Sequence, residues 1–173
     1  MKKLLFTAMI ITGLAAGTFA QDGASATATA TASATIVAPI AISITTHMDF
    51  GNVAVHAVTD GTVVLGTDGA RTVTGGITLP ATTGTVTAAS FAVTGSGTYT
   101  YNITSPTANV TLTDPVTEET MILSTFVRDP SGTGALTDGA QTINIGATLN
   151  VAGGQAAGTY ANATAIPVVV VYN

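Results

Sequence analysis

The chain has 173 residues, of which 46% are hydrophobic and only 8% are charged, and none is a cysteine. Its formal net charge is −5, and its four basic residues exclude the dense cationic surface that a nucleic-acid-binding protein needs. The absence of cysteine excludes disulfides and thiolate metal sites, so packing and hydrogen bonds must stabilise the fold.

Residues 1–20 have the pattern of a secretion signal. Lys2 and Lys3 precede an apolar stretch that is too short to be retained as a transmembrane helix, and small residues end the segment. We predict cleavage before Gln21, which would take the formal net charge from −5 to −7 by removing the two lysines. The protein is therefore expected to be exported, to the cell surface, the periplasm or the extracellular space.

Residues 21–35 are predicted to form an N-terminal extension in which small side chains alternate. From Ala26 to Ala34, alanine occupies every even position, and serine or threonine occupies every odd one. A period of two suits an extended strand, but a lone strand has no partner for its backbone groups. The segment is expected to pair within its own domain, to pair with another copy, or to be a flexible leader to the isoleucine-rich residues 35–44.

Residues 36–173 are predicted to form one all-β antiparallel sandwich. Short runs of β-branched and aromatic residues recur between turn-forming clusters, and no long run has apolar residues at helical spacing. An outer-membrane barrel is the alternative, but aromatic residues make up only 5% of the chain, too few for two aromatic girdles. The expected strands lie within residues 35–44, 50–58, 62–65, 71–75, 76–79, 89–95, 98–104, 108–113, 120–127, 141–151 and 164–173.

Local signals refine three of these strands. Pro39 favours an edge position or a break within residues 35–44. The Asp-Gly pair inside Gly66–Ala70 predicts a hairpin loop, because Asp-Gly supplies positive φ angles. Tyr99, Tyr101 and Ile103 have the same parity, so we expect them on one face of their strand.

No catalytic or metal-binding constellation is evident, and an enzyme is not expected. His47 and Asp49 would point to the same side of a strand, but His56 has the other parity, so a three-ligand zinc site is disfavoured. Glu118 and Glu119 are adjacent and would face opposite sides of a strand. The remaining aspartates mostly precede glycine or proline, as turn residues do. We predict no cofactor, no metal and no catalytic residue.

The final strand is apolar on both faces. Such a strand is buried on both sides or covered by a partner, because an unpaired β-branched strand is an aggregation hazard. It is either an ordinary terminal strand of its own sheet or one that also serves assembly. One parity of this strand carries Ile166, Val168, Val170 and Tyr172.

Six extended stretches of the sequence share one resemblance, and together they cover nearly all of the chain after the signal. They are Ala34–Ser43, Met48–Val55, Gly61–Pro80, Ala88–Thr104, Asp129–Tyr160 and the closing VVVVYN. These stretches resemble the DUF4402 family of exported bacterial proteins. The resemblance implies kinship with the Mat/Ecp common-pilus subunits and, more distantly, with the chaperone–usher pilins.

The resemblance implies a structural subunit of a fimbria-like surface assembly that polymerises by β-strand exchange. Its fold would be an incomplete immunoglobulin-like sandwich whose groove is filled first by a periplasmic chaperone and then by the next subunit, with an outer-membrane usher as a further partner. The donor positions would be Ala26, Ala28, Ala30, Ala32, Ala34 and Ile36. The positions on the acceptor and chaperone side would be Ile166, Val168, Val170 and Tyr172.

Two questions stay open from the sequence. The donor is either residues 24–36 or the bulkier residues 35–44, because alanine buries little apolar area. The alternative function is a monomeric secreted or periplasmic module that binds a glycan or a protein, for which Tyr99, Tyr101 and Tyr160 are the only plausible aromatic platform.

Overall fold

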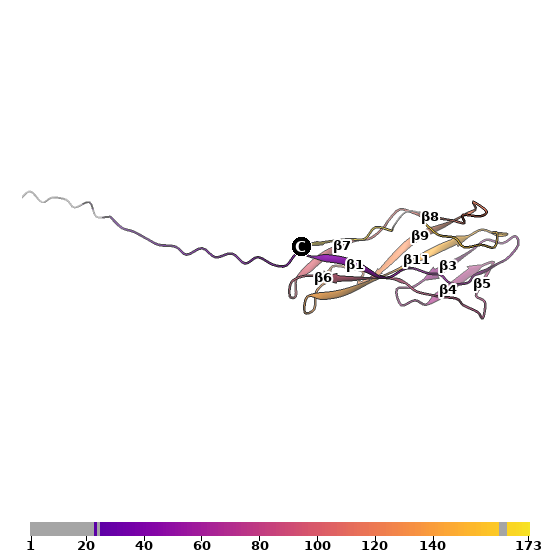
Figure 1. The fold of residues 1–173 in the computed structure, drawn as a ribbon, viewed down its shortest axis with the longest axis horizontal. Helices are drawn as coiled ribbons and strands as arrows, with labels where there is room; N and C mark the ends of the chain where they lie inside the picture. Colours follow the sequence, from indigo (N-terminus) through magenta and orange to yellow (C-terminus); the bar gives the residue numbers. More distant parts are fainter. Residues whose placement is uncertain (1–22, 24, 163–165) are drawn as a thin grey trace, which may run out of the picture. The chain divides into compact units, whose positions relative to one another are not determined.

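The computed structural model describes residue 23, residues 25–162 and residues 166–173. The predicted signal peptide and its cleavage site before Gln21 lie outside the described residues. Residues Ile36–Asn173 form one compact unit, shown as a ribbon in Figure 1. Its strands are β1 (Ala41–Thr46), β2 (Ala54–Val55), β3 (Gly61–Leu65), β4 (Arg71–Gly75), β5 (Ile77–Thr78), β6 (Ala89–Thr94), β7 (Thr100–Thr104), β8 (Val110–Thr113), β9 (Thr120–Asp129), β10 (Gly134–Ala135), β11 (Ala140–Val151) and β12 (Val169–Tyr172).

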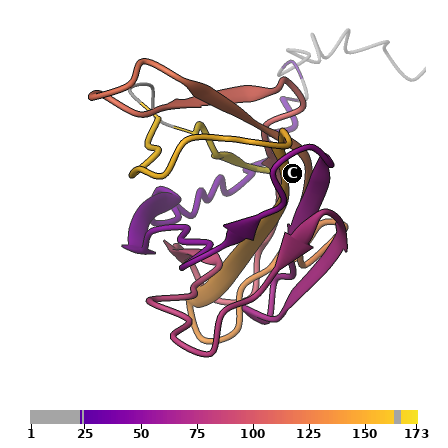
Figure 2. The ribbon, with the colours of Figure 1, turned by 90° about the vertical axis from the view of Figure 1, so that its right-hand side faces the viewer.

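The predicted all-β antiparallel sandwich is confirmed. Every strand pair is antiparallel, and the described residues contain no helix, so none that could span a membrane. In the end-on view of Figure 2 the strands lie in layers around the core. The larger layer is a seven-stranded sheet, and a three-stranded sheet in the order β10-β7-β12 and the short pair β2-β5 complete the domain.

The twelve-residue strand β11 organises the larger sheet. One of its edges pairs with β9, and the other pairs with β6 over Ala140–Ile145 and then with β3 over Ala147–Val151. Gly146 lies at this change of partner, where a Cβ atom would clash with the carbonyl oxygen of Leu65. A glycine inside a strand pattern often marks such a close backbone approach.

The core has two clusters of buried side chains, one toward each end of the sandwich. The first includes Phe50, Leu123 and Leu149, and the second includes Tyr101 and Ile145. Alternate residues of β11 supply both clusters, which is the burial pattern of a sheet with one covered face. The long strand therefore links the two halves of the core.

The predicted hairpin loop at Gly66–Ala70 is confirmed. It connects β3 to β4, with Gly69 at a φ of +81°. The side-chain oxygen of Asp68 accepts a hydrogen bond of 3.0 Å from the amide of Ala70, and the amide of Gly66 bonds the carbonyl of Ala70 at 2.8 Å. The Asp-Gly pair thus acts through its local backbone geometry, as expected.

The isoleucine-rich stretch behaves as two pieces. The strand begins only at Ala41, after Pro39, so the predicted break is confirmed. Ile40 and Ile42 pack against the second core cluster. Ile36, by contrast, is 96% exposed, and Ile44 is 48% exposed next to a register irregularity. The shared parity of these residues therefore does not give them a shared environment.

Candidate functional site

The C-terminal strand β12 has one free edge. It pairs with β7 in a register that joins Val169 to Thr104 and Tyr172 to Tyr101, and no other described strand pairs with it. The amide of Asn173 continues this ladder by donating to the carbonyl of Thr100 at 3.2 Å. In an antiparallel ladder, hydrogen-bonded and non-hydrogen-bonded residue pairs alternate. The ladder therefore uses the amides of residues 169 and 171, and the amides of residues 170 and 172 are directed outward, in the plane of the sheet and away from β7.

The two faces of β12 differ in burial. Val170 and Tyr172 pack against the second core cluster, as does Val168 just before the strand, whereas Val169 and Val171 are 51% and 58% exposed. The strand is therefore covered on its inner face only. Its outward backbone groups and its outer valines together make it an edge of the kind that favours pairing with another chain.

Tyr172 anchors the end of this strand. Its hydroxyl accepts a hydrogen bond from the amide of Ser96 at 2.7 Å and donates one to the carbonyl of Ala38 at 3.1 Å. Its ring packs against Tyr99, with centroids 5.7 Å apart and planes inclined by 56°. A Cβ atom on Gly95 would clash with the Tyr172 hydroxyl, so this glycine makes room for the anchor. One side chain thus connects β12 to the segment that enters β1.

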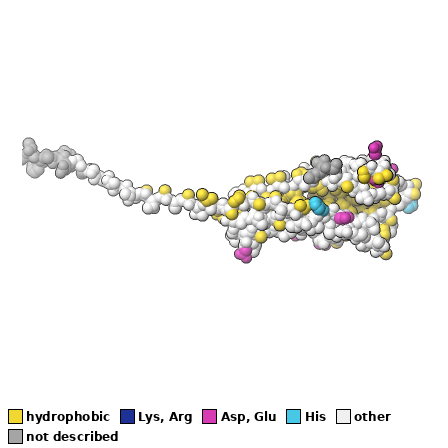
Figure 3. Space-filling view, viewed as in Figure 1, with side chains coloured by type: hydrophobic (Ala, Val, Ile, Leu, Met, Phe, Trp, Pro, Cys, Tyr) yellow, Lys and Arg dark blue, Asp and Glu magenta, His cyan; other side chains and the backbone are white. Residues whose placement is uncertain are grey.

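A groove with a volume of about 890 Å³ and an apolar floor lies at the other half of the sandwich. One wall is residues 48–55, and the other is residues 155–162 together with Ile166. In the space-filling view of Figure 3, apolar side chains gather in a hollow on this face of the domain. The floor is formed by Leu112, Met121, Leu123, Leu149 and Val151. Ile166 lies three residues before the start of β12, so one lining residue of the groove and the free strand edge lie on the same short stretch of chain.

Each wall of the groove is held by a charged side chain. On one side, Nη1 of Arg71 donates to the carbonyl oxygens of Phe50 and Asn52, the latter at 3.1 Å. On the other side, Oε2 of Glu119 accepts a hydrogen bond of 2.9 Å from the amide of Ala156. Neither residue belongs to a recognisable motif in the sequence. Charge is the only sequence feature that distinguishes Arg71 and Glu119, because charged residues are rare in this chain.

The predicted donor positions lie in a segment without regular structure. Residues 25–35 contain no helix or strand, and they include every predicted donor position from Ala26 to Ala34. Ile36 is the first residue of the compact unit and is the most exposed of the large apolar residues described. Ala24 lies outside the described residues.

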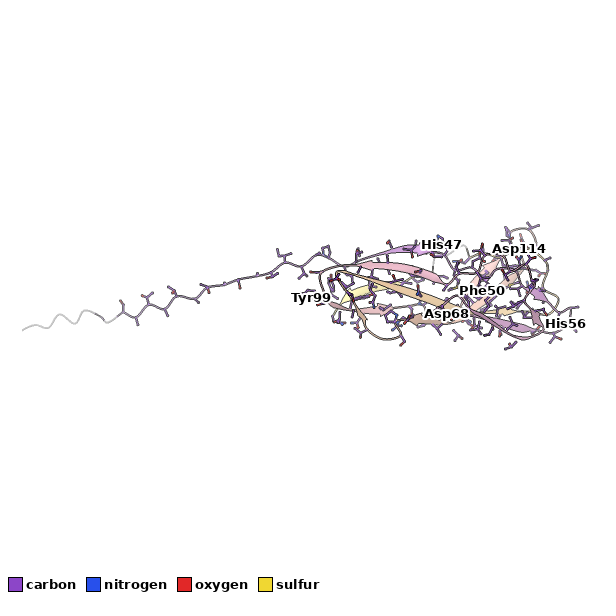
Figure 4. All side chains as sticks on the ribbon, turned by 90° about the horizontal axis from the view of Figure 1, so that it is seen from below. His47, Phe50, His56, Asp68, Tyr99 and Asp114 are labelled. Atoms are coloured by element: carbon purple, nitrogen blue, oxygen red, sulfur yellow. The ribbon has the colours of Figure 1, made fainter. Side chains whose placement is uncertain are left out.

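The residues considered for metal binding are not brought together. In Figure 4, His47 and His56 lie far apart along the domain. Asp49 accepts a bond from the amide of Gly51 at 2.7 Å, and Nδ1 of His56 accepts one from the amide of Val58 at 3.3 Å, so both act in local turns. Within the described part of the chain, no group of three or more potential metal ligands forms.

The three tyrosines do not form one aromatic surface. Tyr101 is fully buried and donates to Oε1 of Gln141 at 2.6 Å, and burial raises the pKa of its hydroxyl. Tyr160 is half-buried beside the groove, and Tyr99 packs on Tyr172 at the far end of the domain, where Figure 4 labels it. A glycan platform built from all three is therefore contradicted by the burial of Tyr101.

Fold and site together define an all-β sandwich with an open strand edge in one half and a groove with an apolar floor in the other. The chain belongs to the family described as "Domain of unknown function (DUF4402)", whose model matches residues 40–172. The resemblance seen in the sequence is thus confirmed at the level of this family. No curated protein and no solved structure matches the chain.

Proposed function

We propose that the protein is a structural subunit of a fimbria-like surface assembly that polymerises by β-strand exchange. In this assembly, residues 24–36 of one copy add to the free edge of β12 in the next copy and continue along the groove of that copy. The single observation that carries the proposal is the free edge of β12, with two amides directed outward and no second strand partner among the described residues.

Strand addition suits the chemistry of both segments. In this mode, main-chain hydrogen bonds supply the affinity, and pockets for alternate side chains supply the specificity. Residues 24–36 would reach about 43 Å when extended, whereas β12 spans about 13 Å, so the added strand could cover β12 and pass beyond it. Alanine side chains bury little apolar area, so the backbone ladder would contribute most of the binding, with Ile36 as the one large side chain.

Partners and location follow from this mechanism. Before assembly, a periplasmic chaperone would cover the free edge, because an exposed edge promotes aggregation. An outer-membrane usher would then exchange the chaperone for the next copy. The predicted signal at residues 1–20 provides the export that this route requires. The kinship with common-pilus subunits belongs to this proposal.

The first experiment removes the donor. Deletion of residues 21–35 should convert SDS-resistant ladders of the exported protein into monomer, as seen on unboiled gels. The folded state of the deletion variant is checked by its cooperative unfolding. Ladders that persist unchanged in the folded deletion variant would refute the proposal.

A second experiment tests which face of the donor is buried. Ala30→Asp places a carboxylate on the even-numbered face, where burial without a partner is costly, and should abolish the ladders. Thr31→Asp makes a similar change on the odd-numbered face and should largely preserve them. Equal effects of the two substitutions would contradict a donor strand of this parity.

The groove also favours one alternative, a monomeric binding module for a peptide. Its volume of about 890 Å³ is within the range of roughly 300–1,000 Å³ that ligand sites occupy. This alternative predicts a monomer that binds its ligand equally well after residues 21–35 are deleted. The same deletion variant therefore separates the two functions.

A further inference from the structure

One wall of the groove is a loop, residues 155–162, which we call the wall loop. The carboxylate of Glu119 reaches it from the end of the turn between β8 and β9. Oε2 of Glu119 accepts hydrogen bonds from the amide of Ala156 and from Nε2 of Gln155, both at 2.9 Å. The hydroxyl of Tyr160 lies 3.3 Å from the same oxygen. A single carboxylate oxygen therefore contacts three groups of the wall loop.

The loop also closes on itself at this point. The hydroxyl of Tyr160 is 2.9 Å from the carbonyl oxygen of Ala156, to which it can donate, and Nε2 of Gln155 donates to the same hydroxyl at 3.0 Å. Hydrogen bonds to an ionised carboxylate are roughly twice as strong as those between neutral groups. Glu119 is thus the charged centre of a small network that fixes the shape of the loop.

The turn that carries Glu119 is itself well anchored. Asp114 is 2% exposed, and its Oδ1 accepts a bond from the amide of Val116 at 2.8 Å. The backbone closes the turn between Asp114 and Glu119, whose amide-to-carbonyl bond is 2.9 Å. A Cβ atom on Gly158 would clash with the Asp114 carboxylate, so the wall loop packs directly on this turn. The carboxylate of Glu119 therefore projects from a fixed base.

The wall loop has a second attachment that can report on the first. Thr113 and Ala161 exchange two backbone hydrogen bonds, of 2.8 and 3.1 Å, at the far side of the loop. Neither of these bonds involves Glu119. The exchange rate of the Ala161 amide therefore measures the mobility of the loop without measuring the Glu119 contact itself.

We propose that Glu119 is a positioning residue for strand addition, which holds the wall loop so that the groove is formed before a strand arrives. This inference rests on the proposed function, because it assigns the groove to an incoming strand. Its physical basis is preorganisation: when only a fraction of the molecules has the binding-competent wall, the apparent affinity falls by that fraction. Glu119 touches the wall and not the incoming strand.

The first test is hydrogen exchange in the full chain. Glu119→Ala removes the acceptor. We expect the Ala161 amide to exchange at least about tenfold faster, because loss of the acceptor raises the population of the open loop. Glu119→Gln keeps a carbonyl acceptor and should restore most of the protection. Glu118→Gln is the matched control, because it removes the same charge from a neighbour whose side chain makes no hydrogen bond in the described part of the chain. Unchanged Ala161 exchange in Glu119→Ala would overturn the inference.

The second test measures binding of a synthetic peptide of residues 23–37 to the full chain at concentrations where it is monomeric. We expect the apparent affinity of Glu119→Ala to be about tenfold lower than that of the unmodified chain, with Glu119→Gln intermediate and Glu118→Gln unchanged. Equal affinities in all four proteins would overturn the positioning role while leaving strand addition intact. If the peptide binds neither the unmodified chain nor any variant, that result would instead overturn the proposed function and this inference with it.

Discussion

A proline at position 170 offers the sharpest perturbation of the free strand edge. The ladder with β7 uses the amides at 169, 171 and 173, so Val170→Pro removes an outward amide and no bond of that ladder. The matched control is Val170→Ala. It removes two carbon atoms from a half-buried side chain, which costs about 1 kcal/mol of folding stability at roughly 0.8 kcal/mol per fully buried carbon.

The two variants should therefore differ in assembly far more than in stability. Loss of one ladder bond costs about 1 kcal/mol, and the ring also obstructs the incoming backbone, so assembly of Val170→Pro should fall at least about tenfold. Urea unfolding gives the stability, and sedimentation velocity with SDS ladders gives the assembly. If Val170→Pro is folded and assembles as well as Val170→Ala, the outer edge of β12 is not the acceptor.

Three further predictions concern the framework of the site. Gly146→Ala should destabilise the domain by about 2 kcal/mol or more in urea unfolding, since the new Cβ would clash with the carbonyl of Leu65. Gly132→Ala is the control. It has open space around its Cβ and should change the stability by less than about 0.5 kcal/mol. Tyr172→Phe loses two hydrogen bonds and should cost about 1–3 kcal/mol; an unchanged unfolding midpoint would contradict the anchoring role. Arg71→Met keeps an apolar stem but loses both bonds to the groove wall, and should cost about 1–3 kcal/mol and shift the amide NMR signals of residues 50–53; unshifted signals would argue against this anchor.

The parts of the fold that local chemistry determines could be predicted from the sequence. The Asp68–Gly69 pair specified its hairpin loop through bonds within five residues, and Pro39 specified where its strand could begin. The parity of Tyr101 and Ile103 also placed both side chains in the core. Tyr99 has the same parity but precedes β7 and is 49% exposed, so periodicity was reliable only within the strand itself.

The groove could not be predicted, because its walls are about a hundred residues apart in the chain. Residues 48–55 and 155–162 are brought to one groove by long-range contacts, such as the hydrogen bond of 2.9 Å from the amide of Gly154 to the carbonyl of His56, which no local pattern specifies. Glu119 illustrates the difficulty. As a neighbour of Glu118 it could be assigned only a face of a strand, whereas it lies in the turn before β9, where its partner depends on where the wall loop passes. Gly146 did carry a usable signal, since a glycine inside a strand often marks an irregular or close backbone.

The environment of the isoleucine-rich stretch bears on which segment would be donated in the proposed assembly. Residues 41–46 form five register pairs with β6, and Ile42 packs into the second core cluster of its own domain. Donating this strand to another copy would break that ladder and expose Ile42, a loss of several hydrogen bonds at about 1 kcal/mol each before any gain. Residues 25–35 contain no strand of their own to break, and Ile36 is 96% exposed. For the proposed assembly, the balance of these terms favours residues 24–36 as the donor, with β1 remaining paired to β6 in its own domain.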